Sequence, residues 1–155
     1  MKAIDNQLVK ILFRFYSNLL DQWTVETMWA AVVDADKGHY QIKNTPFYAS
    51  IAFEDIVFAE YDETEGMLTY RDTFEFSGNS TIQVVMMSKA IAMNDVMQLF
   101  NEMGCGFEGF SESYFVLNIP ADKDYQPIKR KLSELQDQGV IDYAEPVLSD
   151  QHYCY

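Results

Sequence analysis

Histidine and cysteine are the side chains best suited to acid–base, nucleophilic and metal chemistry near neutral pH, and this sequence has two of each. His39 and His152 lie far apart, and neither belongs to an HExxH spacing. Cys105 stands between two glycines, but the segment Gly104-Cys105-Gly106 is too short for a phosphate-binding loop and does not follow a predicted strand. A buried structural cysteine is the commoner case there. We therefore predict that the protein is not an enzyme and has no catalytic residues, cofactor or metal site.

The two ends of the sequence carry no signal for export or metal binding. Asp5 stands where the apolar region of a signal peptide would begin, and no apolar stretch reaches the ~20 residues needed to span a bilayer. The final residues, 152–155, include His152 and Cys154, but a second His/Cys pair is missing, which favours a frayed terminus. Two thiols in a chain of this size fit a reducing compartment. We predict a cytoplasmic protein with no membrane partner.

Acidic side chains dominate the charge of the sequence. The formal net charge is −13, and the longest basic run is Lys129-Arg130-Lys131, so we predict no nucleic-acid partner. The excess is uneven: ten acids face three bases between residues 34 and 75, whereas residues 1–33 balance at three and three. An acidic surface serves solubility alone or attracts a basic protein, and both interpretations stay open at this point.

The acids most suited to a partner surface cluster in one predicted hairpin. Its turn has a projecting, solvated group of like charges rather than a shielded acid–base pair. The candidate partner-binding residues are Glu60, Asp62, Glu63 and Glu65 in this hairpin, followed by Asp72 and Glu75.

A polar turn that switches at once to aromatic residues occurs at Asn44-Thr45-Pro46-Phe47-Tyr48. Asparagine hydrogen-bonds local backbone, and proline fixes its own φ and biases the preceding residue toward an extended conformation. We favour a structural turn with Phe47 pinned in the core over a binding loop.

Period-two alternation predicts strands through the first half of the chain. Apolar residues occupy the odd positions from Val9 to Phe15, and in residues 25–33 we assign Trp29 and its odd neighbours to the buried face. Further strands are predicted at residues 39–42, 56–61, 67–76 and 81–87, with turns between them. Six strands with short connections predict a small curled sheet or barrel.

The second half changes to a helical period. Asn94 is predicted to cap one helix that Gly104 ends, and Asp124 to cap another that Gly139 ends. Strands are predicted at residues 107–110, 114–119 and 141–147. Counted from the strand at residue 81, the order β-α-β-β-α-β predicts a ferredoxin-like arrangement.

The predicted class is therefore α+β: a mostly antiparallel β lobe (residues 1–80), a ferredoxin-like βαββαβ lobe (81–148) and a tail (149–155). No linker separates the lobes, so we predict one compact unit across residues 1–155. Phe13, Trp29, Leu99 and Leu117 are the predicted core residues because each lies on the apolar face of its element.

An ordered series of short motifs resembles a bacterial family catalogued as domain of unknown function 4265. The series covers nearly the whole chain, although residues 150–155 extend past the family pattern. This resemblance implies a stand-alone bacterial cytoplasmic protein and supplies no catalytic residues. The motifs lie at residues 9–15, 28–30, 44–49 (Asn44-Thr45-Pro46-Phe47-Tyr48-Ala49), 55–57, 77–81, 103–105, 117–120 and 135–143.

Two functions follow as hypotheses, ahead of an unrecognised enzyme. By analogy with small acidic bacterial proteins, we predict a non-catalytic immunity protein (antitoxin) that binds and neutralises a delivered toxin domain. The expected toxin is basic, and a nuclease is one candidate. The alternative is a small-ligand-binding or regulatory domain with a cleft between the two lobes.

Overall fold

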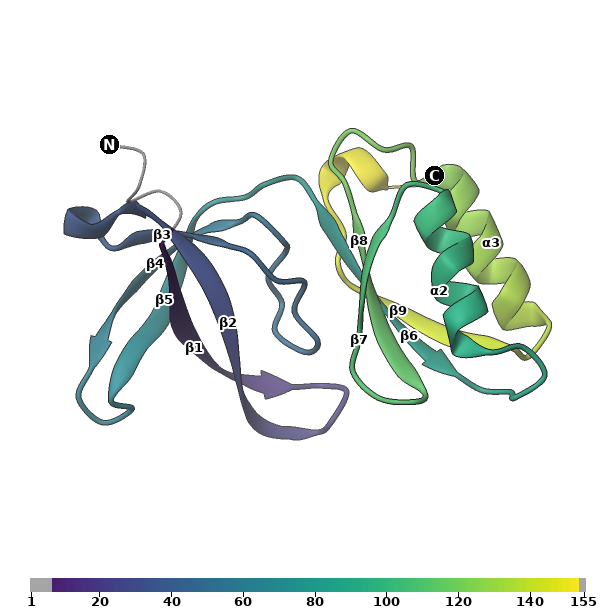
Figure 1. Cartoon of the computed structure of the whole chain (residues 1–155), viewed down its shortest axis with the longest axis horizontal. Coiled ribbons are helices and arrows are strands. Elements are labelled where there is room, and N and C mark those ends of the chain that lie inside the picture. The colour runs from purple at the N-terminus through teal and green to yellow at the C-terminus, as the bar shows by residue number, and fades with distance from the viewer. Residues whose placement is uncertain (1–6, 154–155) are drawn as a thin grey trace. The chain divides into compact units, whose positions relative to one another are not determined.

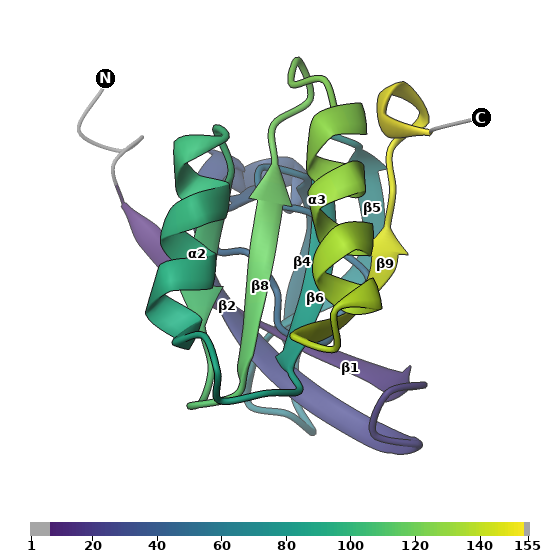
Figure 2. The ribbon, with the colours of Figure 1, turned by 90° about the vertical axis from the view of Figure 1, so that its right-hand side faces the viewer.

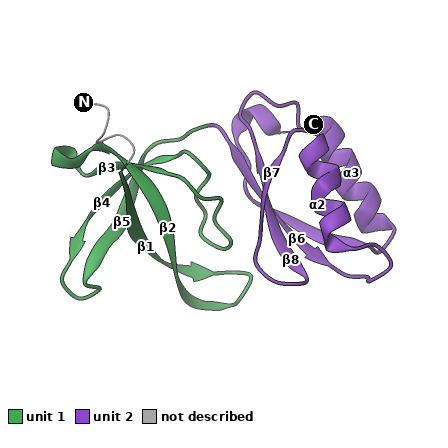
Figure 3. Cartoon of the chain, in the orientation of Figure 1, with its two compact units in different colours: residues 1–77 green, residues 78–155 purple. Residues whose placement is uncertain are grey.

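The structure is a computed structural model that describes residues 7–153 (Figure 1). Its strands pair antiparallel apart from one parallel contact, and both helices cover one face of a single sheet (Figure 2), so the fold is α+β. The chain divides into two compact units, Met1–Ser77 and Gly78–Tyr155 (Figure 3). The lobe boundary predicted from the sequence was after residue 80, close to this division. Residues 1–6, considered for an export signal, and Cys154 lie outside the described residues.

Unit 1 is a five-stranded curled sheet. Neighbouring strands pair in sequence order, and a parallel contact between Leu12 and Thr69 joins the first strand to the last and closes the sheet into a barrel. Gly38, which ends a 3-10 turn (η1, Ala35–Lys37), has φ +75°, and a Cβ there would meet the Ala59 carbonyl oxygen at 2.8 Å. The strands are β1 (Leu8–Ser17), β2 (Gln22–Asp34), β3 (His39–Ile42), β4 (Ile56–Asp62) and β5 (Met67–Glu75).

The predicted buried face of β2 is wrong. Directly opposite residues of an antiparallel pair point to the same side of the sheet, and Phe13 lies opposite Glu26 while Ile11 lies opposite Met28. Because the odd positions of β1 face the core, the even positions of β2 must do so too. Met28 and Ala30 are accordingly buried, and Trp29 is exposed.

The core of unit 1 is filled by aliphatic and aromatic side chains from all five strands and from the loop between β3 and β4. Phe13 is buried as predicted, and its ring stacks on Tyr70 with 4.7 Å between the ring centroids. The buried members are Ile11, Phe13, Met28, Ala30, Tyr40, Ile42, Ala49, Ile51, Val57 and Ala59.

Unit 2 is a four-stranded antiparallel sheet with strand order β7-β8-β6-β9. Its core lies between the sheet and the two helices, with Phe100 and Leu132 facing Leu117 and other sheet residues. Leu117 is fully buried and Leu99 partly buried. The elements are β6 (Ser80–Met86), α2 (Met93–Glu102), β7 (Gly106–Gly109), β8 (Tyr114–Ile119), α3 (Gln126–Asp137), β9 (Ile141–Val147) and a 3-10 turn, η2 (Asp150–His152).

The helix starts differ from those predicted. Ala92, not Asn94, is the N-cap of α2, and no side chain caps it. Tyr125 is the N-cap of α3, while Asp124 accepts a hydrogen bond from the Gln126 amide at 3.1 Å from the position before the cap. Gly104, with φ +96°, follows α2 as predicted. Lys123 lies over it, so a side chain at this position would collide with the lysine.

Candidate functional site

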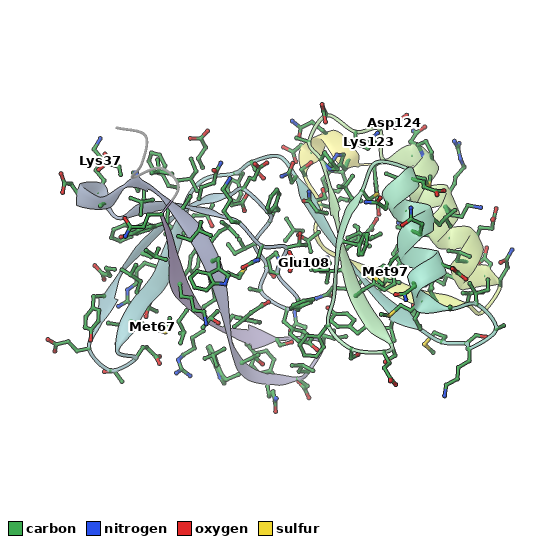
Figure 4. The ribbon with its side chains drawn as sticks, in the orientation of Figure 1. Lys37, Met67, Met97, Glu108, Lys123 and Asp124 are labelled. Carbon is green, nitrogen blue, oxygen red and sulfur yellow. The ribbon has the colours of Figure 1, made fainter. Side chains whose placement is uncertain are left out.

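The hairpin between β4 and β5 presents the acids predicted to meet a partner. One carboxylate oxygen of Asp62 accepts hydrogen bonds from the Thr64 and Glu65 amides, at 2.8 and 3.0 Å, and so shapes the turn. Met67, where β5 begins, marks this end of unit 1 in Figure 4. The hairpin turn is therefore ordered by one of its own acids.

Arginines pair with three of the four hairpin acids, a feature that the sequence analysis missed. Arg71 contacts Glu60 at 3.0 Å and Asp62 at 2.9 Å. Arg14, from β1, contacts Glu65 at 2.7 Å. The hydrogen bond from Arg71 holds the pKa of Asp62 below its usual value of 3.8, so this carboxylate stays charged. The hairpin therefore carries less uncompensated charge than its sequence indicates.

The other candidate acids remain exposed. Glu63 projects from the turn, and no ion pair involves it within residues 7–153. Asp72 lies opposite Phe58 and Glu75 opposite Ile56, near the far end of β5 from the turn. The structure thus gathers Glu60, Asp62 and Glu65 around arginines. It places Asp72 and Glu75 on β5, away from the turn.

Residues 44–55 are fixed by two carboxylates on which the sequence analysis placed no weight. The Glu26 carboxylate accepts hydrogen bonds from three successive amides, those of residues 47, 48 and 49, at 2.6 to 3.1 Å. Asp55, 1% exposed, accepts from the Ala52 amide at 3.0 Å and from the Ser77 amide at 2.8 Å. Burial raises the pKa of Asp55, and the hydrogen bonds oppose that shift. Both acids therefore stabilise the backbone conformation of this segment.

Asn44 also has a structural contact, in line with the predicted turn. Its side-chain oxygen accepts a hydrogen bond from the Trp29 amide at 2.7 Å, and the Trp29 carbonyl accepts from the Lys43 amide at 2.8 Å. The segment that follows β3 is thereby tied to β2.

The surroundings of Cys105 do not suit a nucleophile. Cys105 is 2% exposed, and burial raises its thiol pKa to about 12 despite the nearby Lys123 ammonium (Figure 4). A thiol with that pKa is protonated at neutral pH and therefore unreactive. The His39 ring stacks on Phe74 with 4.0 Å between centroids. No group of three potential metal ligands occurs within residues 7–153.

His152 is buried rather than frayed, which corrects the prediction for the tail. Its Nδ1 lies 2.6 Å from the Ser80 hydroxyl oxygen and its Nε2 lies 2.9 Å from the Pro120 carbonyl oxygen. The Ser80 oxygen also accepts from the Ser149 amide at 2.8 Å. Ser80 and His152 are 0% and 1% exposed, so this serine–histidine pair is closed to substrate. The pair links η2 to the start of β6. Its two residues are 72 positions apart, so no local sequence pattern predicts the contact.

An exposed apolar surface covers the outer side of the β1–β2 hairpin. We call it the ribbon face. The outward residues form cross-strand pairs, among them Tyr16 with Trp23 and Lys10 with Trp29. The Tyr16 and Trp23 rings meet edge to face, and the Lys10 ammonium lies 5.2 Å from the Trp29 ring centroid. Its exposed large apolar residues are Leu8, Tyr16, Trp23, Val25, Trp29 and Val33, with Leu19 and Leu20 in the connecting turn.

The fold and surfaces define an α+β protein of two units that has buried histidine and cysteine side chains and exposed acidic and aromatic ones. Residues 26–143 match the family model described as "Domain of unknown function (DUF4265)", and the chain belongs to this family. No curated protein matches the chain. Among the residues that the structure describes, no helix is long and apolar enough to cross a membrane.

A crystal structure of a hypothetical protein from Neisseria gonorrhoeae is similar in fold. Its TM-score is 0.79 at 23% sequence identity, and the match covers 93% of this chain and 97% of that one. At this identity the likeness concerns the fold alone.

Proposed function

We propose that this protein is a non-catalytic bacterial immunity protein of the cytoplasm, which binds and neutralises a delivered, basic toxin domain. The family resemblance and the acidic charge motivate the proposal, and the observation that carries it is the set of exposed acids on β5 and its turn. Acids of this kind complement a cationic active site and steer association without any chemistry. The buried Cys105 and His152 are consistent with a binding role.

The six candidate acids differ in what they offer such a partner. Glu60, Asp62 and Glu65 already pair with arginines, so their fields are partly neutralised. Glu63, Asp72 and Glu75 are exposed, and we expect them to contribute most of the attraction. The arginine-paired acids then help mainly by holding the hairpin in shape.

The test uses the protein encoded by the gene beside this one. Its expression should stop growth of a host cell, and co-expression of this chain should restore growth. Normal growth without this chain would remove that protein as the toxin. A growth defect that this chain does not relieve would contradict the immunity proposal.

The interface is tested by stopped-flow association with that toxin. Changing Glu63, Asp72 and Glu75 together to lysine should slow association by about tenfold, and raising the salt concentration should slow the wild type, since exposed charges are screened over about 8 Å at physiological salt. The matched control changes the exposed Glu102, Glu112 and Asp137 of unit 2 to lysine, with the same change in net charge. An equal effect in both variants would assign the steering to overall charge. A rate indifferent to salt would leave the acidity to solubility.

The alternative is small-ligand binding, which the sequence placed in a cleft between the lobes. A cavity of about 430 Å³ within unit 2 supports ligand binding at a different place. Its walls include Met86, Met87 and Met93 with Lys89 and Glu112, and a volume of this size suits a small organic molecule. A ligand that co-purifies with the wild type and is lost in Met93→Glu would favour this function. Purified protein that contains no ligand and still neutralises the toxin would favour the immunity function.

We further propose that unit 2 is ferredoxin-like. The support is its element order β-α-β-β-α-β together with two helices on one face of an antiparallel sheet.

A further inference from the structure

The ribbon face is more apolar than a surface that meets only water needs to be. Trp23 is 69% exposed, Tyr16 46% and Trp29 44%. A whole aromatic side chain has roughly 200 Å² of surface, so with the exposed aliphatic neighbours the face amounts to roughly 600 Å². That is the upper end for patches on monomers, and it approaches the ~800 Å² per partner of a standard interface.

Within residues 7–153, no third strand pairs with the far part of this hairpin, although Phe15 on its inner side packs against the core of unit 1. β2 pairs with β3 only from Ala30 onward, and the ladder between β1 and β5 consists of the single pair Leu12–Thr69, beside which Phe13 stacks on Tyr70. The strands around Tyr16 and Trp23 therefore form a two-stranded ribbon. A two-stranded ribbon needs a packed face to be stable in water. Its inner face is packed through Phe15 and Ser17, and the ribbon face is the one left exposed.

Charge restricts what can cover the ribbon face. Residues 1–33 carry as many bases as acids, in a chain with a net charge of −13. On the face itself the charged strand residues are Lys10 and Arg14, and Arg14 is neutralised by Glu65. A strongly basic partner is drawn to the acids of β5. A second copy of this chain is repelled by most of the surface but meets little repulsion at this near-neutral, apolar face.

We propose that the protein forms a homodimer in which the ribbon face of one chain covers the ribbon face of a second copy. The pairing is isologous, so Trp23 and Trp29 of both chains are buried in the same interface. Aromatic side chains at the centre of such a contact are the usual sites of strong binding.

Two measurements on the purified wild-type protein test the dimer directly. Light scattering after gel filtration should give the mass of two chains at micromolar concentration. Trp23 and Trp29 are the two tryptophans of the sequence, so their fluorescence reports on this face. Emission should shift to shorter wavelength as the protein concentration rises. Raising salt from about 0.05 to 0.5 M should tighten the dimer several-fold, since it screens repulsion between two acidic chains.

Variants separate this face from other exposed aromatic residues. Trp23→Glu should weaken the dimer at least tenfold and leave circular dichroism unchanged, because the side chain is exposed. The matched control is Phe76→Glu, which changes a more exposed aromatic outside the ribbon face and should keep the dimer. If Trp23→Glu fails to fold, the concentration-dependent fluorescence of the wild type decides.

Three results would overturn the proposal. The first is a light-scattering mass of one chain at protein concentrations up to hundreds of micromolar and high salt. The second is a dimer equally strong in Trp23→Glu. The third is a monomer whose tryptophan emission shifts only when phosphatidylcholine vesicles are added, which would assign the face to a membrane. None of them bears on toxin binding.

Discussion

Two regions of unit 1 use carboxylates in opposite ways. In the segment between β3 and β4, Glu26 and Asp55 are turned onto backbone amides and fix the path of the chain. In the β4–β5 hairpin, Glu60, Asp62 and Glu65 meet arginine side chains at the surface. A count of acids treats both groups alike. Their contacts separate acids that bind backbone amides of a distant segment from acids that pair with arginines at the surface, and Asp62 also binds the amides of its own turn.

The comparison predicts the largest stability effect at Glu26. Glu26→Ala removes the acceptor of three partly buried amides, and we expect a loss of about 2–4 kcal/mol in the free energy of unfolding. Urea unfolding measures it, with Glu63→Ala as the control that should change nothing measurable. Equal midpoints for the two variants would break the distinction between the regions.

A smaller effect is expected at Asp55. Asp55→Asn retains one acceptor oxygen for two amides, so stability should fall by about 1–3 kcal/mol. Burial raises the pKa of Asp55 above 3.8, so the folded state prefers the protonated acid and loses stability as pH rises through the folded pKa. The cost of Asp55→Asn should therefore shrink between about pH 3 and pH 7. Urea unfolding at several pH values measures this cost, and a cost that grows instead would mean that the hydrogen bonds outweigh burial.

The smallest effect is expected at Asp62. Its pKa is lowered by Arg71, so its contribution to stability is present above 3.8 and is lost as pH falls through the folded pKa. Carboxyl NMR should show Asp62 titrating below 3.8 and Asp55 above it. Arg71→Gln should move Asp62 back toward its usual value while leaving Asp55 unchanged. Movement of both signals would indicate a general structural change rather than the loss of one pair.

The sequence predicted most elements because their periods are local. It failed on the face of β2, where both parities carry apolar residues: Val25, Trp29 and Val33 on one side, Met28 and Ala30 on the other. Local alternation cannot choose between them. The choice comes from register against β1, since Phe13 lies opposite Glu26.

The acidic hairpin was predicted as a structural element, but its pairing with arginines was not. Glu60 to Glu65 do form a hairpin, yet Arg14 reaches Glu65 across 51 residues, and the three amides on Glu26 come from a segment more than 20 residues away. Contacts of this range follow from the closed sheet. His152 in unit 2 is a further long-range case, since its partners Ser80 and Pro120 are distant in sequence and are brought to it by the tertiary fold.

The contact between Ser80 and His152 brings the two ends of unit 2 together and makes its path nearly a ring. The order of β6, β8 and β9 within the sheet does not depend on where the chain ends lie. A circularly permuted unit, joined by a short linker from residue 153 to residue 79 and opened between the exposed Lys89 and Ala90, would keep the same sheet order and the same core.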